Sequence, residues 1–76
     1  MMRKQRFKVT FFVNTSHPSM ALAGVFDMLR YDNATVENWV HRPDGPNREE
    51  WELTLQSEHF TPDRWSSFGI RTQGVL

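Results

Sequence analysis

The sequence contains no cysteine, so neither a disulfide bond nor a thiolate metal site can stabilise it. Its 76 residues suffice for one small domain with a limited core, and we predict a single domain over residues 1–76. The apolar runs are too short for a membrane-spanning helix. The basic start, residues 1–8, is not followed by the apolar core of a signal peptide. We therefore expect a cytoplasmic protein that does not bind membranes.

The sequence also has no net charge, because its nine Lys and Arg residues balance nine Asp and Glu residues. This balance disfavours a dedicated nucleic-acid binder held by phosphate contacts. The charges are unevenly placed, however, with four cations in residues 1–8 and six acids in residues 44–63. We expect a basic strand to pair with an acidic strand, Arg6 and Lys8 meeting Glu50 and Glu52. The alternative is a surface of two signs that recognises a partner.

Motifs for catalysis and metal binding are absent as well. The histidines at 17, 41 and 59 lack the spacing of a helical metal pair, and a weak site at His41 with Glu37 or Glu52 is the remaining alternative. No nucleophile elbow surrounds Ser66 and Ser67, and no glycine-rich loop could hold a phosphate. The sequence predicts a protein that is not an enzyme and has no catalytic residues, cofactor or metal.

Aromatic residues are plentiful, with six Phe, three Trp and one Tyr. In the absence of disulfide bonds, we expect their large buried areas to stabilise the domain. Residues 6–13 alternate as a strand with one buried face. Pro18 then suits the first turn of a helix capped by Ser16 or His17. The apolar face of this helix repeats at helical spacing through Leu22, Val25, Phe26 and Leu29.

Two further strands are predicted over residues 35–41 and 49–57, joined by the turn-rich loop 42–48. In the first of them we expect Val36 and Val40 to point inward, although a bulge would move Trp39 to the other side. Thr61 should cap a short helix that Gly69 ends, with Phe60 and Ile70 packing on Trp65. Residues 70–76 offer a short edge strand.

The order strand, helix, strand, strand, short helix and a final short strand predicts an α+β fold. We expect a compact antiparallel sheet of three or four strands with the helices on one face. This is the ferredoxin-like split βαβ pattern, or a truncated version of it. The rule of right-handed crossovers places the third strand between the first two.

The stretch "GVFDMLRYDNATV", residues 24–36, concentrates polar residues where the helix meets the next strand. We interpret it structurally. Asn33 takes the left-handed conformation after the helix, and Arg30 lies in the last turn near the negative end of the dipole. Tyr31 should cover the helix end, and Asp32 should pair with Arg30 or the following turn. The alternative is a recognition site made of Arg30, Tyr31 and Asp32.

The face of the sheet away from the helices is the other candidate binding surface. We expect Phe12 and Trp39 there, among Lys8 and His41. Such aromatics could stack the bases of single-stranded nucleic acid, assisted by the cations at positions 3, 4 and 6. They could also pack on the C-terminal tail or on a second copy of the chain. We expect a homodimer because small domains gain stability by pairing, with either the Phe12–Trp39 patch or an unpaired strand edge as the contact.

The segment "FDMLRYDNATV", residues 26–36, resembles a stretch of small uncharacterised proteins of actinobacterial phages. The resemblance implies an accessory protein that binds a host or phage macromolecule in the host cytoplasm. Together with the missing catalytic motifs, it favours a protein–protein interaction module that modulates a host process. It carries no established functional residues over to this chain.

Overall fold

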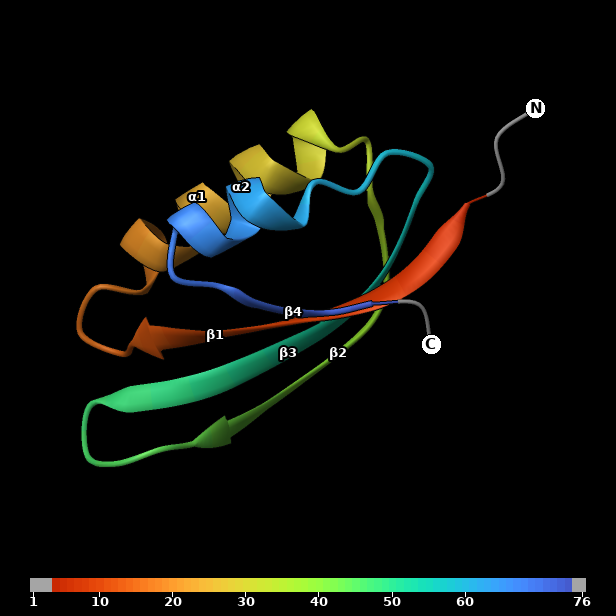
Figure 1. Ribbon diagram of the computed structural model, residues 1–76. Helices are drawn as coiled ribbons and strands as arrows, with labels where there is room; N and C mark the ends of the chain where they lie inside the picture. The colour runs from red at the N-terminus through yellow and green to blue at the C-terminus, as the bar shows by residue number, and fades with distance from the viewer. Residues whose placement is uncertain (1–3, 75–76) are drawn as a thin grey trace.

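The computed structural model describes residues 4–74 and contains a four-stranded sheet with two helices (Figure 1). The elements follow one another as β1 (Gln5–Asn14), α1 (Pro18–Tyr31), β2 (Thr35–Pro43), β3 (Arg48–Ser57), α2 (Pro62–Ser67) and β4 (Arg71–Gln73). The strands are ordered β2-β3-β1-β4, and every neighbouring pair is antiparallel. The predicted α+β fold is confirmed, with β3 between β1 and β2 as the crossover rule requires. Within residues 4–74, neither helix is long and apolar enough to cross a membrane.

Both helices lie on one face of the sheet (Figure 1). Helix α1 packs over β1 and α2 packs against β4, so β2 is the strand farthest from the helices. The buried core lies between the two helices on one side and β1 with the neighbouring part of β3 on the other. It consists of Phe7, Val9, Phe11, Val13, Val25, Met28, Leu53, Leu55, Trp65 and Ile70.

Helix α1 begins and ends close to the positions that the sequence indicates. Pro18 occupies the first helical position after His17, whose side chain makes no capping bond. The Asn14 side chain instead accepts a hydrogen bond from the Ser16 backbone at 2.8 Å. Asn33 has a φ of 50°, which confirms the left-handed residue predicted after the helix.

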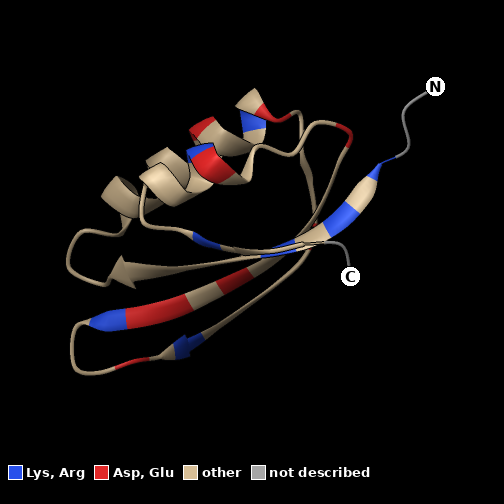
Figure 2. Ribbon diagram, in the orientation of Figure 1, with Lys and Arg blue, Asp and Glu red and all other residues tan. Residues whose placement is uncertain are grey.

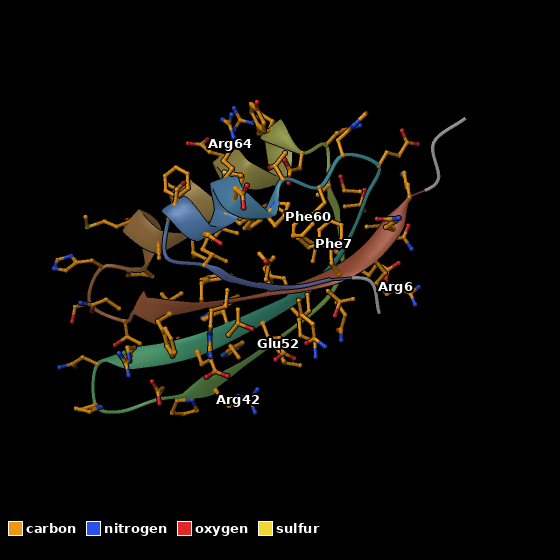
Figure 3. The ribbon with its side chains drawn as sticks, in the orientation of Figure 1. Arg6, Phe7, Arg42, Glu52, Phe60 and Arg64 are labelled. Carbon is orange, nitrogen blue, oxygen red and sulfur yellow. The ribbon has the colours of Figure 1, made fainter. Side chains whose placement is uncertain are left out.

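Helix α2 is held against the sheet by aromatic stacking. The ring of Phe60 lies 3.5 Å from that of Phe7 and 6.4 Å from that of Trp65, measured between centroids, and Figure 3 shows Phe7 and Phe60 between helices and sheet. The chain leaves α2 through Gly69, at a φ of 75°, as predicted. Ile70 is buried in the same core as Trp65, and the expected edge strand follows as β4.

The inward direction predicted for Val40 is wrong, because β2 contains the bulge that the sequence left open. The register shifts between Val36, which pairs with Leu55, and Asn38, which pairs with Thr54. Directly paired residues of antiparallel strands point to the same face. Trp39, opposite the inward Leu53, therefore faces the helix side of the sheet, and Val40, opposite Glu52, faces the outer side.

Candidate functional site

An apolar groove lies between α1 and the β2 side of the sheet. Its volume is about 400 Å³. It exists because the two helices pack over β1 and β4, which leaves the inner face of β2 without a helix among the described residues. We call it the Trp39 groove, and its lining is entirely apolar: Phe11, Leu22, Val25, Phe26, Leu29, Val36, Trp39, Trp51 and Leu53.

Two large side chains at this groove remain open to solvent. Trp39 and Phe26 are each 58% exposed. Phe26 was predicted on the buried face of the helix, but Val25 and Met28 occupy that face and Phe26 leans toward the open side. Rings that gather at an apolar groove, rather than lying singly on the surface, are typical of an interaction site.

An unpaired strand edge lies next to the groove, because β2 is an edge strand of the sheet. It pairs with β3 along one side, and within residues 4–74 no strand pairs with its other side, which we call the free edge of β2. The strand is nine residues long and exposed at every position except the half-buried Val36. A long exposed edge presents unpaired backbone N–H and C=O groups that can pair with another chain.

His41 stands on the inner face near one end of the groove. Its ring stacks on Trp51 at 4.8 Å between centroids, and its Nδ1 lies 3.0 Å from Glu49 Oε2. Its carboxylate neighbour is therefore Glu49, and not Glu37 or Glu52, which were the alternatives considered from the sequence. Among residues 4–74, no three His, Asp or Glu side chains are grouped as metal ligands. The geometry gives His41 a role in holding Trp51 against the sheet.

Phe12 and Trp39 do not share a face, so the binding surface predicted on the outer face is wrong in its composition. Phe12 stays on the outer face, where the Arg48 guanidinium lies 4.6 Å from its ring centroid. Trp39 and His41 face the helices because of the bulge in β2. A base-stacking platform that needs both Phe12 and Trp39 on one face is therefore not formed.

Ion pairs occupy much of the outer face. Lys8 lies 3.5 Å from Glu52, which confirms that the basic strand pairs with the acidic one. Arg6 binds Glu37 at 2.8 Å and not Glu50. Arg42 supplies the cation for Glu50, at 3.3 Å. Figure 2 shows red acidic segments of the sheet beside blue basic ones, and Figure 3 labels Arg42 and Glu52 on this side of the sheet. Of the N-terminal cations invoked for nucleic acid, Arg3 lies outside the described residues.

The three candidate residues of the corner after α1 point in different directions. Arg30 is solvated and lies 4.0 Å from Asp27. Tyr31 does not cover the helix end but is 59% exposed, with the Arg64 guanidinium 3.6 Å from its ring centroid. Asp32 does not pair with Arg30, because it is 1% exposed and accepts hydrogen bonds from residues of α2 and its cap. Arg30 and Asn33 thus occupy the structural places predicted for them, in the last turn and just after the helix, whereas the contacts predicted for Tyr31 and Asp32 are wrong.

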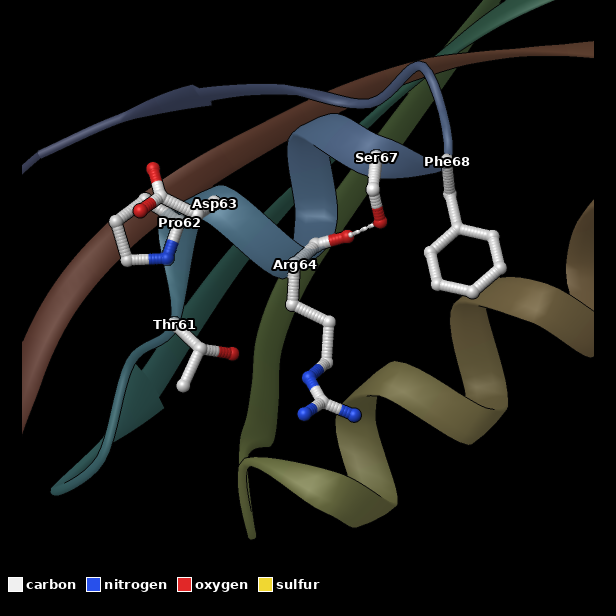
Figure 4. Close-up of a pocket in the computed structure, with 6 residues that line it drawn as sticks. All are labelled: Thr61, Pro62, Asp63, Arg64, Ser67 and Phe68. Atoms are coloured by element: carbon white, nitrogen blue, oxygen red, sulfur yellow. Dashed lines mark hydrogen bonds between the residues drawn. The ribbon is translucent and has the colours of Figure 1, made fainter.

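Further hollows adjoin α2, and two of them expose large side chains. Figure 4 shows a wide, open depression along the helix, lined by both polar and apolar atoms, in which Arg64 extends toward α1 and Ser67 donates to the Arg64 carbonyl at 2.6 Å. A smaller hollow of about 240 Å³ lies between α1, α2 and the end of β1, where Met20 and Phe68 are exposed. Neither hollow adjoins a long unpaired strand, so the Trp39 groove is the stronger candidate.

Val40 and Arg42 were not among the candidate site residues named from the sequence, and Glu37 was named only as an alternative ligand beside His41. All three lie on β2, on the outer face of the sheet. Their direction follows from the bulge, and the sequence does hold a signal for it. The residues that face inward, Val36 and then Trp39 and His41, are separated first by three positions and then by two. Such a change in spacing within one strand is typical of a bulge.

No protein-family model matches the sequence, and a search of curated proteins gives no significant match. The structure resembles the solution structure of the C-terminal domain of the MgtC protein from Mycobacterium tuberculosis, with a TM-score of 0.69. The two sequences are 11% identical, and the match covers 92% of this chain and 86% of that domain. At this level of identity, the likeness shows a shared α+β fold.

Proposed function

We propose that this chain is a non-enzymatic protein–protein interaction module that binds a strand of a partner protein at the free edge of β2. The observation that carries this proposal is the juxtaposition of the free edge with the Trp39 groove. An added strand would obtain backbone hydrogen bonds from the edge, and alternate side chains would point toward the groove side. Affinity and specificity would then come from two adjacent features of one surface.

The chemistry of the surface favours an apolar strand. The lining of the Trp39 groove is apolar throughout, so a charged side chain would lose its hydration there without gaining a partner. On the other face, the cations of β1 and β2 are engaged by acids of β2 and β3. This pairing leaves little net positive potential to attract a phosphate backbone, which supports a protein partner over a nucleic acid.

The resemblance to actinobacterial phage proteins supplies the setting of the proposal. In that setting the chain is an accessory protein of the host cytoplasm, and its partner is a host or phage protein. Binding would modulate a host process by blocking a surface of the partner or by bringing two proteins together. The chain itself would catalyse no reaction.

A comparison of matched surface variants tests this function. The tagged chain is used to capture proteins from lysate that also contains the untagged chain, and Trp39→Ser is compared with Phe68→Ser. Phe68 is 61% exposed and Trp39 58%, so the two changes remove similar exposed surface from different sites. We expect one identified protein to be captured by the wild type and by Phe68→Ser, and to be lost with Trp39→Ser.

The purified partner should then slow hydrogen exchange of the β2 amides. Capture of nucleic acid alone, or equal capture by both variants, would overturn the proposed function.

A further inference from the structure

We propose that the strand which occupies the free edge of β2 is β2 of a second copy of this chain, antiparallel and centred on Val40. This inference rests on the proposed function and names its partner. The two sheets would join edge to edge around a two-fold axis into one sheet of eight strands, with all four helices on the same face.

The directions of the β2 side chains favour this register. Val40 points to the outer face, opposite Glu52, while Trp39 and His41 point to the inner face. When Val40 lies opposite Val40 of the second copy, Trp39 lies opposite His41 of that copy. Each opposed pair then shares a face, as antiparallel pairing requires. A shift by a single residue would set inward side chains opposite outward ones.

Charge complementarity supports this register. The bulge places Glu37 on the outer face, where Arg6 and Gln56 donate to its carboxylate. Pairing around Val40 sets Arg42 of the second copy opposite Asn38, next to Glu37. The Arg42 side chain is 60% exposed and that of Glu37 is 28% exposed. Each would exchange part of its pairing within the chain, Arg42 with Glu50 and Glu37 with Arg6, for the contact between chains. The two-fold axis forms this pair twice.

A register in which the pairing of the two β2 strands is shifted by two residues does not bring Glu37 and Arg42 together. Centring the axis on His41 sets Arg42 opposite Val40, and Glu37 then faces the loop after β2. The contacts at the inner face also favour the Val40 register, because it places an imidazole beside each exposed Trp39 ring.

The pairing also changes the groove. Trp39 of each copy would lie on the inner face at the new strand pair. The two Trp39 grooves would therefore be adjacent on the same face of the joined sheet. The surface covered consists of one strand edge and a few half-exposed side chains, which is small for a permanent dimer. We therefore expect a reversible dimer that dissociates on dilution.

Sedimentation equilibrium from micromolar to millimolar concentration tests the pairing. The mass of the wild type should rise from one chain to two, and Val40→Lys should stay at one chain. The substitution places like charges directly opposite each other across the two-fold axis. It should be tolerated within one chain because Val40 is 46% exposed and lies opposite Glu52. Phe68→Ser, the matched control away from β2, should keep the dimer.

A charge-exchange experiment tests the register and does not depend on Val40→Lys. Glu37→Arg and Arg42→Glu each set like charges against each other in the homodimer, so each variant alone should dimerise more weakly. In a mixture, each heterodimer contains two pairs of opposite charge, and the two-chain mass should return. A wild type of one-chain mass throughout, or a mixture no more dimeric than its components, would overturn the inference.

These outcomes separate the inference from the proposed function. A wild-type chain that stays single, yet captures a different identified protein through Trp39, would end the self-pairing and leave the interaction module standing. Loss of both dimer and capture would end both.

Discussion

Trp65 donates its indole N–H to Oδ2 of Asp32 at 2.7 Å, and the two residues are 0% and 1% exposed. The same carboxylate accepts the Thr61 hydroxyl at 2.7 Å and the Thr61 backbone N–H at 3.2 Å. One side chain after α1 thus orients the start of α2, and it takes the hydroxyl that would otherwise cap that helix. The buried side chain accepts three donors, which is the arrangement that makes a buried carboxylate tolerable.

Replacing Asp32 should therefore destabilise the fold strongly. Asp32→Ala leaves the buried Trp65 donor and the half-buried Thr61 donors without their acceptor, and we expect it to lower the free energy of unfolding by about 3 kcal/mol. Chemical denaturation measures this loss, with Asp27→Ala as the exposed control. An Asp32→Ala protein of wild-type stability that no longer binds its partner would instead make the corner a recognition site.

Asn33 should tolerate glycine but not a β-branched residue. Its φ of 50° lies in the left-handed region that glycine adopts freely. We expect Asn33→Gly to stay within roughly 0.5 kcal/mol of the wild type and Asn33→Val to cost about 1 kcal/mol or more. The same denaturation assay checks both variants, and equal stabilities would contradict the strain argument.

Tyr31 and Arg30 should contribute modestly to stability. Tyr31→Ala removes a half-exposed ring and its contact with the Arg64 guanidinium, for an expected loss of about 1 kcal/mol. Arg30→Ala removes a solvated charge at 4.0 Å from Asp27, which should cost less than about 0.5 kcal/mol. A larger loss for Arg30→Ala than for Tyr31→Ala would show that this order is wrong.

Trp39 and Phe7 should respond to truncation in opposite ways. Phe7 is 1% exposed and stacks on Phe60, so Phe7→Ala should cost about 3–5 kcal/mol. Trp39→Ser should change stability by less than about 1 kcal/mol, because the ring is already largely in solvent. Partner binding, measured on both proteins under conditions where they are folded, should fall for Trp39→Ser alone.

The local pattern of the sequence was enough to predict the elements and their order. The alternation around Phe7 and Val9 identified β1, and Asn33 and Gly69 identified the ends of the two helices. The order of the strands then followed from the crossover rule. These features depend on residues close in sequence or on general chirality.

The candidate site depends on contacts and strand directions that cannot be predicted from any short stretch of the sequence. Asp32 is buried by Thr61 and Trp65, which lie 29 and 33 positions further along the chain. Trp39 changes face because of one extra residue in β2. The exposure of Phe26 follows from where α1 rests on the sheet, and helical spacing shows which residues share a face but not what covers them.

Disulfide trapping at position 40 tests the central claim, that the free edge of β2 is a binding surface for a second copy. The chain has no cysteine, so a single introduced thiol can form a disulfide only between chains. Side chains directly opposite in an antiparallel pair have Cβ atoms about 4.5–5.5 Å apart, close to the disulfide range. Under mild oxidation, Val40→Cys should form a covalent dimer much faster than Phe68→Cys, although Phe68 is the more exposed residue. Equal rates, or faster trapping of Phe68→Cys, would contradict the pairing.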